Sequence, residues 1–194
     1  MTDLGEVEGS LSRQLAMQRL KSVERFDMLV VGGGATGLGI ALDAASRGLS
    51  VALLERDDFS KGTSSRATKL LHGGVRYLAQ GNLSLVREAL RERTVLLNNA
   101  PHLAQPLPFL VPAYGLKGRL WDQPRYGIGL KMYDLLAGKA GLGSTELLGR
   151  ESTRALAPGV RPQELVGAVK YWDGQFDDSR LGIALARPAT AWCA

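Results

Sequence analysis

The sequence has little of the chemistry that cysteine and histidine provide: one cysteine, Cys193, and two histidines, His72 and His102, in 194 residues. A lone cysteine excludes a framework of internal disulfides and favours a reducing compartment such as the cytoplasm. Neither histidine lies near cysteines or carboxylates at ligand spacing, so we expect no metal site. The apolar runs are too short to cross a bilayer, and the N-terminal segment has no signal-peptide core. Any membrane contact is therefore expected to be peripheral, on the inner face.

Aromatic residues are also scarce, at 6% of the chain, although the net charge is +5. The basic residues are spread between acids rather than gathered in a block. Nucleic-acid-binding proteins more often show a concentrated basic stripe with interleaved aromatics. The composition therefore argues against a nucleic-acid partner, and it suits anionic small ligands or an acidic membrane surface.

A glycine turn between short apolar segments predicts a βαβ unit near the N-terminus. Residues 28–31 are apolar and too few for a helix, so they indicate a buried parallel strand. A helix is predicted over 35–47, where Gly48 ends it, and a second buried strand over 50–54. The right-handed crossover makes the two strands parallel. The fold class is therefore α/β, with a Rossmann-like βαβ unit.

The remaining elements are predicted from the spacing of apolar residues and from the positions of prolines and helix-capping residues. An amphipathic leader helix over 11–25 places Leu11, Leu15 and Leu20 near one face, and we expect it to dock on its own domain. Further elements are expected as follows: helices over 83–100, 127–137 and 151–156, an extended segment 108–114 at a sheet edge, a strand from 166, and a helix 179–187 capped by Asp177 or Asp178. The side chains of Trp121, Tyr133 and Trp172 are expected to pack.

The glycines of the first turn have the spacing of a dinucleotide-binding fingerprint. Gly32 permits the tight turn, Gly34 lets backbone approach a pyrophosphate, and Gly37 lets helix and strand pack closely. The helix N-terminus then faces the phosphate charges. Glu55 ends the second strand 23 positions after Gly32, where a carboxylate binds a ribose and repels a 2′-phosphate. The pattern predicts a dinucleotide other than NADP.

The loop after the second strand favours FAD over NAD, because it is too long and too rich in binding groups for an idle connection. The hydroxyls of Thr63, Ser64 and Ser65 can donate to phosphate oxygens, and Lys69 supplies a mobile cation. Gly73 and Gly74 have no side chains, so their backbone can lie against a flat ring. The planar guanidinium of Arg76 can form two hydrogen bonds to a phosphate, and Tyr77 adds a hydroxyl beside it.

Three motifs in order closely resemble the FAD-dependent glycerol-3-phosphate dehydrogenases. They are the glycine turn with GLGIALDAASRG, the loop TSSRATKLLHGGVRYL, and the helix LVREALRERTVLLNNAPHL. The resemblance runs from Phe26 to about Arg187 and includes YWDGQFDDSRLGIALAR. It implies an FAD-binding fold joined to part of an antiparallel-sheet substrate domain.

The resemblance also implies a function and roles for residues. The activity would be oxidation of sn-glycerol 3-phosphate to dihydroxyacetone phosphate, with electrons passed to a quinone and peripheral attachment to a membrane. The segment from Thr63 to Gly74 would wrap the flavin, where His72 could touch the ring. Arg76 and Tyr77 would hold the substrate phosphate. No residue of this chain is assigned as the catalytic base.

Family members are far longer than this chain, so we divide it by its expected relation to the whole. The segments are a leader helix (1–26), the first part of the FAD-binding domain (27–82), helices with part of the substrate domain (83–165), a strand and helix returning to the FAD domain (166–187), and a tail unlike the family (188–194). The end of the resemblance suggests a truncated or frameshifted product or an incomplete gene model, and we expect weak or absent FAD retention and no turnover by this chain alone. Two alternatives stay open: an FAD oxidoreductase of the amine or amino-acid oxidase type, and a non-catalytic nucleotide-binding fragment.

Overall fold

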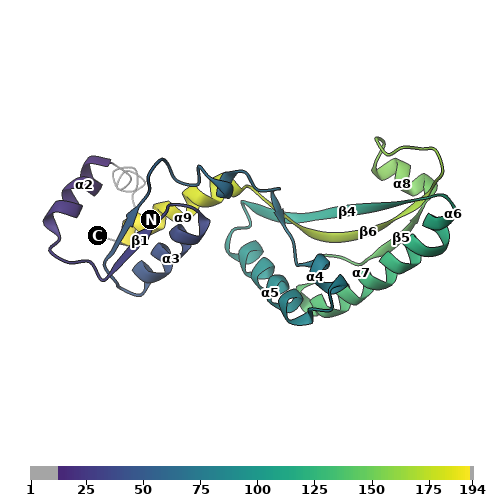
Figure 1. Ribbon diagram of the computed structural model, residues 1–194, viewed down its shortest axis with the longest axis horizontal. Coiled ribbons are helices and arrows are strands. Elements are labelled where there is room, and N and C mark those ends of the chain that lie inside the picture. The colour runs from purple at the N-terminus through teal and green to yellow at the C-terminus, as the bar shows by residue number, and fades with distance from the viewer. Residues whose placement is uncertain (1–12, 193–194) are drawn as a thin grey trace. The chain divides into compact units, whose positions relative to one another are not determined.

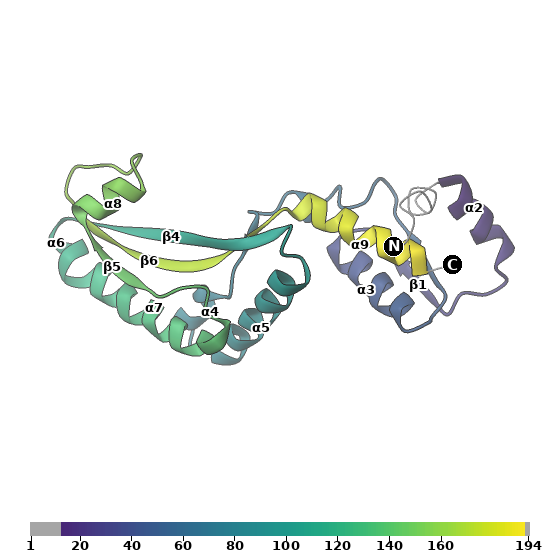
Figure 2. The same cartoon turned by 180° about the vertical axis from the view of Figure 1, so that it is seen from behind.

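The computed structural model describes residues 13–192, which form two compact units (Figures 1 and 2). Unit 1 comprises the described residues up to Lys69 and from Asp177 onward, and unit 2 comprises Leu70–Phe176. The first boundary between the two units therefore falls after Lys69, whereas the sequence analysis expected the first part of the FAD-binding domain to end at Asn82. The returning segment 166–187 is shared, because its strand pairs within unit 2 and its helix packs within unit 1.

Unit 1 contains the predicted βαβ unit. Strand β1 (Met28–Val31) pairs in parallel with β2 (Val51–Leu54), with Met28 opposite Val51, and helix α3 (Ala35–Ser46) connects them. Small side chains let this helix lie close to the strands: its buried residues are Leu38, Ala41, Ala44 and Ala45. Val30 and Val51 complete the apolar core from the strands. The local sequence was therefore sufficient to predict this unit.

Two helices at the ends of the chain depart from the prediction. Helix α9 (Asp178–Trp192) packs on α3 and continues through Pro188, five residues beyond its predicted end. Burial of Ala186 and Ala189 on either side of the proline favours the continuation. Helix α2 (Arg13–Ser22) was expected to dock on its own domain. None of its residues is buried, so it has no side that is packed against that domain. Leu11 and Cys193 lie outside the described residues.

Unit 2 is built on a four-stranded antiparallel sheet. Strand β6 (Leu165–Phe176) is its centre, and β4 (Ala104–Tyr114) pairs with it along one edge. On the other edge, β3 (Leu70–Leu71) and β5 (Glu146–Gly149) pair with opposite ends of β6. The structure thus confirms the expected combination of a parallel βαβ unit with an antiparallel sheet.

The edge position of β4 follows from its prolines. The strand is longer than predicted and contains prolines at 106, 108 and 112, which alternate along it. Residues two or four apart direct their backbone nitrogens to the same side, and a proline nitrogen carries no hydrogen to donate. Such a strand can pair fully on one side only, so β4 closes the sheet at this edge.

Helices cover the sheet of unit 2. Figures 1 and 2 show α4 (Val75–Ala79), α5 (Leu83–Asn99) and α7 (Gln123–Ala137) on one face and α8 (Arg150–Leu156) beyond the other. Helix α5 begins after Asn82, whose side chain caps it by accepting from the N–H of Leu85. Val86 and Leu90 of α5 pack against Tyr133 of α7 in the core.

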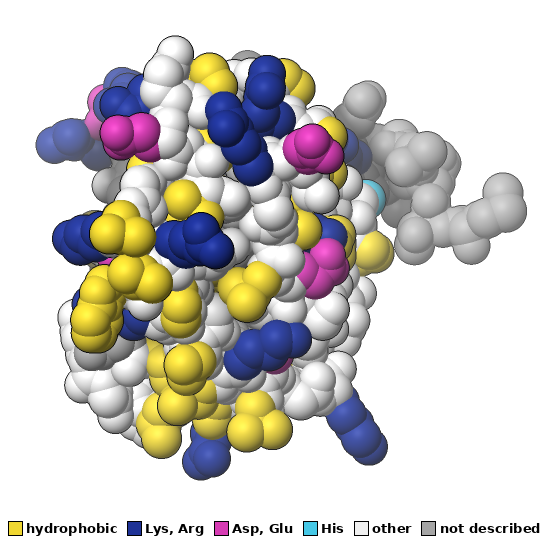
Figure 3. Space-filling model, turned by 90° about the vertical axis from the view of Figure 1, so that its right-hand side faces the viewer, with side chains coloured by type: hydrophobic (Ala, Val, Ile, Leu, Met, Phe, Trp, Pro, Cys, Tyr) yellow, Lys and Arg dark blue, Asp and Glu magenta, His cyan; other side chains and the backbone are white. Residues whose placement is uncertain are grey.

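Three consecutive helical elements form a nearly continuous helical segment from residue 115 to residue 137. They are α6 (Gly115–Lys117), the π-helical turn η2 (Gly118–Asp122) and α7. Pro124 explains the wide turn, because its ring has no N–H and crowds the carbonyl one turn earlier. Trp121, which was expected to pack, is instead 71% exposed. Figure 3 shows one face of the molecule, on which hydrophobic side chains gather in the lower part of the view with Lys and Arg side chains around them.

Among the helices of residues 13–192, none is both long enough and apolar enough to cross a membrane.

Candidate functional site

The glycine turn at the start of α3 has the geometry of a dinucleotide-binding turn. Gly32 has φ +107°, a conformation that L side chains rarely adopt. A Cβ on Gly37 would lie 1.9 Å from the carbonyl oxygen of Gly32, so helix and turn are in direct backbone contact. Gly34 precedes the helix in an extended conformation, and a Cβ on it would lie 3.1 Å from the Oγ of Ser64. Each glycine therefore occupies a position that its predicted role requires.

Glu55 at the end of β2 lies against the same turn. Its Oε2 accepts from the N–H of Gly33 at 2.7 Å, and its Oε1 accepts from the N–H of Asp57 at 2.8 Å. These bonds lower the pKa of the Glu55 carboxyl, the bond from Asp57 most and that from Gly33 next. The carboxylate is therefore ionised at neutral pH and held in place beside the helix N-terminus.

An open pocket of about 360 Å³ adjoins this carboxylate. Its lining brings together four of the predicted residues, Gly34, Glu55, Thr63 and Ser64, with basic side chains that include Lys61 and Arg66. The Oγ of Ser64 accepts from the N–H of Ala35 at 2.9 Å, and its own hydrogen stays available for donation. Ser65 follows in the same 3₁₀ turn, η1 (Thr63–Ser65). The pocket thus offers hydrogen-bond donors, basic side chains and the carboxylates of Glu55 and Asp57, of which Asp57 is paired with Lys61.

Lys69 is not the mobile cation that the sequence suggested. Its Nζ donates to Oδ1 of Asp178 and, at 3.2 Å, to the carbonyl oxygen of Ser65. Asp178 is buried and also accepts from the N–H of Ala67 at 3.0 Å. The Lys69 ammonium, above all, lowers the pKa of the Asp178 carboxyl. These contacts fasten the end of the loop to the first turn of α9, because a buried carboxylate needs such partners.

The predicted flavin-facing residues His72, Gly73 and Gly74 lie in unit 2, between β3 and α4. Gly73 is buried, and a Cβ there would lie 2.1 Å from the Tyr133 hydroxyl oxygen. Its N–H faces both carboxylate oxygens of Asp173, at 3.0 and 3.2 Å. Gly74 has φ +81° and precedes α4, whereas His72 is exposed. Gly73 and Gly74 are both buried, so of these three predicted residues only His72 is exposed.

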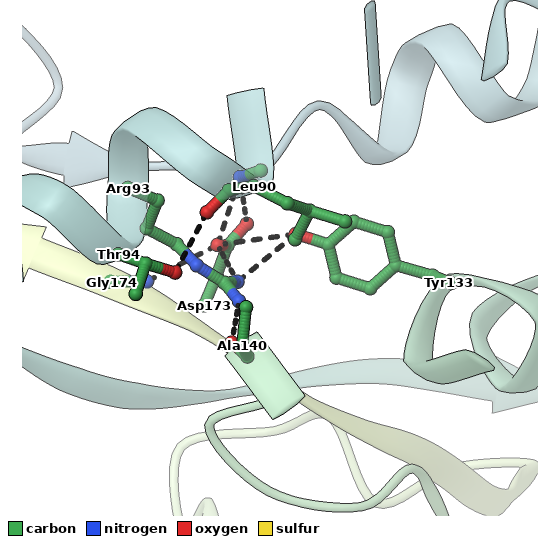
Figure 4. Close-up of polar contacts among 8 residues, drawn as sticks. Leu90, Arg93, Thr94, Tyr133, Ala140, Asp173 and Gly174 are labelled. Atoms are coloured by element: carbon green, nitrogen blue, oxygen red, sulfur yellow. Dashed lines mark hydrogen bonds and ion pairs between the residues drawn. The ribbon is translucent and has the colours of Figure 1, made fainter. Parts of the chain in front are cut away.

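Asp173 belongs to a buried polar cluster, drawn in Figure 4. Nη1 of Arg93 lies 2.8 Å from Oδ1 of Asp173 and 3.1 Å from the Tyr133 hydroxyl. Nη2 of Arg93 donates to the carbonyl oxygen of Ala140 at 2.8 Å. Burial, above all, raises the pKa of the Tyr133 phenol, so this hydroxyl stays protonated. The cluster pairs the two charges that it buries, although Nε of Arg93 has no hydrogen-bond partner among the described residues, and it supports the Gly73 turn.

The two residues predicted to hold a substrate phosphate follow directly in α4. Tyr77 is exposed on this helix. The side chain of Arg76 lies outside the part of the chain that the structure describes. The predicted residues up to Lys69 thus fall in unit 1, and those from His72 to Tyr77 fall in unit 2.

Sequence reasoning missed the residues that support the predicted loop, namely Arg93, Asp173 and Asp178. A signal existed for Arg93, because it follows Leu90 by three positions on the apolar face of α5 and an arginine there requires a buried partner. Asp178 was considered only as a helix cap. Nothing in the local sequence distinguished Asp173, since its partners are far away in the chain.

Comparison with known proteins agrees with this geometry. Residues 27–191 match the model of the family described as FAD dependent oxidoreductase. The mitochondrial glycerol-3-phosphate dehydrogenase of Mus musculus is 48% identical over 188 residues, which is 93% of this chain and 25% of that protein. The crystal structure of glycerol-3-phosphate dehydrogenase from Bacillus halodurans, complexed with FAD, is 31% identical with a TM-score of 0.64, over 94% of this chain and 28% of that one.

A more distant structure shows the fold alone. L-proline dehydrogenase from P. horikoshii is 20% identical with a TM-score of 0.62, and the match covers 87% of this chain and 42% of that one. The family match ends at residue 191, beyond the predicted limit near Arg187, in agreement with the continuation of α9. The chain spans about a quarter of the length of the glycerol-3-phosphate dehydrogenases that it matches.

Proposed function

Because the chain belongs to the family of FAD-dependent oxidoreductases, we propose that it is the cofactor-binding front of an enzyme that oxidises sn-glycerol 3-phosphate to dihydroxyacetone phosphate. The observation that carries the cofactor assignment is the turn at α3, where Gly37 touches Gly32 and Glu55 is held beside the helix N-terminus. Support for the substrate is the 48% identity with a glycerol-3-phosphate dehydrogenase.

The residues of unit 1 fit the nucleotide part of FAD. Gly32, Gly34 and Gly37 would hold the pyrophosphate on backbone amides, and Glu55 would bind the adenosine ribose. Thr63, Ser64 and Ser65 would donate hydroxyl hydrogens to the phosphates. Lys69, fastened to Asp178, acts by ordering the loop rather than by reaching for a phosphate. A carboxylate that is ionised at neutral pH suits a ribose with free hydroxyls.

The residues of unit 2 would serve the flavin ring and the substrate. When bound, FAD supplies the acceptor for the hydride that leaves C2 of the substrate. The backbone of Gly73 and Gly74 would lie against the ring with His72 beside it. Arg76 would form two parallel hydrogen bonds to the substrate phosphate, and Tyr77 would add a hydroxyl. The proton of the C2 hydroxyl is assigned to no residue of this chain.

The electron acceptor in this proposal is a quinone, and the protein attaches peripherally to a membrane where a quinone is available. The basic balance of the chain, with net charge +5, supports contact with an anionic membrane surface. The location would be cytoplasmic, at the inner face of that membrane.

The proposal is tested on a protein that carries this chain within the full length of the family. We expect a yellow protein with flavin absorbance that reduces a redox dye with glycerol 3-phosphate and does so poorly with glycerol. Reduction of a soluble quinone then tests the acceptor. Glu55→Gln should weaken FAD retention, because an amide accepts the ribose hydroxyls less strongly than a carboxylate.

The outcomes separate the proposal from its alternatives. Turnover of amino acids or amines without turnover of glycerol 3-phosphate would point to an oxidase of that type. Bound flavin without any turnover would indicate a nucleotide-binding module. A full-length protein that folds and retains no flavin would overturn the assignment of the cofactor.

A further inference from the structure

Helix α9 contacts the loop that connects β2 to β3. This loop carries Thr63, Ser64 and Ser65, whose hydroxyls we assign to the phosphates of the cofactor. The helix belongs to unit 1, although the chain reaches it only after passing through unit 2, and it lies alongside α3 (Figures 1 and 2). Asp178 and Gly182 are four positions apart on α9, which places them on one side of the helix. Both of them contact the loop.

Asp178 holds the end of the loop. Its carboxylate accepts hydrogen bonds from the N–H of Ala67 at 3.0 Å and from Nζ of Lys69. The same ammonium donates to the carbonyl oxygen of Ser65 at 3.2 Å. Lys69 has φ +62°, a conformation that a residue other than glycine keeps only where its surroundings hold it. The buried carboxylate of Asp178 supplies that hold.

Gly182 contacts the start of the loop at Ser60. A Cβ on Gly182 would lie 2.0 Å from the Oγ of Ser60 and 2.9 Å from its Cβ, so only glycine leaves room there. Ser60 is buried and has φ +57°, and its N–H donates to the carbonyl oxygen of Gly33 at 2.9 Å. Its Oγ has no hydrogen-bond partner among the described residues. The Ser60 side chain is therefore held by its fit against α9 and not by a hydrogen bond of its own.

The segment between these two fixed points lines the pocket beside Glu55. Six of the ten lining residues come from positions 60–66, whereas Asp178 and Gly182 do not line the pocket. The two residues of α9 can therefore act on a ligand in the pocket only through the loop. A loop that is already ordered loses less conformational freedom when a ligand binds, and the affinity is correspondingly higher.

We propose that α9 preorganises the nucleotide-binding loop, with Asp178 and Gly182 as positioning residues that contact the loop and not the cofactor. The inference rests on the proposed function for the identity of the ligand, FAD. It goes beyond that function by giving a role in cofactor affinity to a helix outside the dinucleotide-binding fingerprint. The effect falls on the dissociation constant of FAD, while KM for glycerol 3-phosphate of the FAD-saturated enzyme stays unchanged.

Gly182→Ala tests the contact at the start of the loop, in a protein that carries this chain within the full length of the family. We expect the FAD-free form of this variant to bind FAD at least about tenfold more weakly, because the new methyl displaces Ser60. Titration of flavin fluorescence measures the affinity. Gly39→Ala is the matched control, since a Cβ at position 39 of α3 meets nothing within 4 Å, and it should bind FAD as the unchanged protein does.

Ser60→Gly provides a compensating change. It removes both atoms that the methyl of Gly182→Ala would meet, and glycine adopts φ +57° without strain. The combination of Gly182→Ala with Ser60→Gly should therefore bind FAD within about threefold of the unchanged protein, since the two sites are in contact and their effects do not add. A combined variant that binds as weakly as Gly182→Ala alone would overturn the inference, because the loss then arises away from this contact.

Asp178→Asn tests the contact at the end of the loop. We expect it to weaken FAD binding at least about fivefold, because an amide accepts less strongly than a carboxylate from Lys69. Asp177→Asn is the matched control on the same helix. Its Oδ1 accepts from the N–H of Arg180 at 3.0 Å and not from the loop, so its affinity for FAD should be unchanged. Circular dichroism establishes that each variant is folded.

Hydrogen exchange measures the order of the loop without any cofactor. In the FAD-free protein, the amides of residues 61–68 should exchange at least about tenfold faster in Gly182→Ala, while those of β1 and α3 keep their rates. If the unchanged protein binds no FAD or does not oxidise glycerol 3-phosphate, the proposed function fails, and exchange still decides whether α9 orders the loop. The inference is overturned if Gly182→Ala leaves the exchange of the loop unchanged, or leaves the affinity unchanged in a protein that binds FAD.

Discussion

Arg93 of α5 and Asp173 of β6 form a buried ion pair, with Nη1 of Arg93 2.8 Å from Oδ1 of Asp173 and the two side chains 1% and 4% exposed. The same carboxylate accepts a hydrogen bond from the N–H of Gly73, which lies 100 positions earlier in the sequence. The pair therefore connects a helix and a strand of unit 2 to the turn that we propose lies against the flavin. This buried contact thus fixes the position of the Gly73 backbone.

Removing one partner of this pair should be costly. In Asp173→Asn the guanidinium of Arg93 stays buried without its counter-charge, so we expect a loss of about 3–5 kcal/mol in the free energy of unfolding. Urea denaturation followed by circular dichroism measures it. The matched control is Lys170→Met, which breaks the more exposed pair with Glu146 and should cost less than about 1 kcal/mol. Equal losses in the two variants would contradict the buried-pair argument.

A second prediction concerns two glycines of α3 that differ in surroundings. A Cβ at position 37 meets the Gly32 carbonyl oxygen at 1.9 Å, whereas one at position 39 meets nothing within 4 Å. Gly37→Ala should therefore cost at least about 2 kcal/mol by forcing backbone apart. Gly39→Ala should stabilise the chain by about 0.5–1 kcal/mol through its better helix propensity. Thermal and urea unfolding of both variants give the comparison, and a shift of the same sign in both would refute the close contact at the turn.

The third prediction is a pH dependence that comes from Asp178. Lys69 and the N–H of Ala67 hold the pKa of this carboxyl below its ordinary value of about 3.9. The unfolded chain therefore binds a proton here at a higher pH than the native chain does. The stabilisation is complete above about pH 5 and is lost as the pH falls below 4 toward the native pKa.

Asp178→Asn isolates this contribution, because other carboxyls with lowered pKa values, such as Glu55 and Asp27, titrate in the same window. We expect the variant to be less stable than the unchanged chain at pH 7. The difference should shrink as the pH is lowered from 5 to 3. Unfolding free energies measured at half-unit pH steps show it; parallel curves would mean that Asp178 does not couple to folding in this way.

The sequence predicted what depends on neighbours along the chain. The βαβ unit, the glycine turn and the position of Glu55 follow from short apolar runs, glycine spacing and strand length, and the structure confirms their arrangement. The partners of Asp173 and Asp178 were not predictable in this way. Among these partners Ala67, Gly73 and Arg93 lie 80 to 111 positions away, and only the folded sheet and the returning helix bring them together. The exposure of Trp121 was missed for a related reason, since periodicity marks an apolar side of a helix without showing what covers it.

The final prediction concerns Arg76 in a full-length enzyme. A charged pair of parallel hydrogen bonds to a phosphate commonly contributes about 1.5–3 kcal/mol. Arg76→Ala should therefore raise KM for glycerol 3-phosphate at least about tenfold. Because glycerol has no phosphate for the guanidinium to bind, its slow oxidation should change little, and the preference for the phosphorylated substrate should fall by the same factor.

Tyr77→Phe provides a graded comparison, because it removes one neutral hydroxyl and keeps the ring. Its effect on KM should be smaller than that of Arg76→Ala, since a neutral hydrogen bond contributes about 0.5–1.5 kcal/mol. Retention of flavin absorbance in both variants shows that the cofactor site is intact. If the Arg76 variant keeps the full preference for glycerol 3-phosphate over glycerol, the phosphate is bound by other groups, and the loop after Gly74 serves the flavin alone.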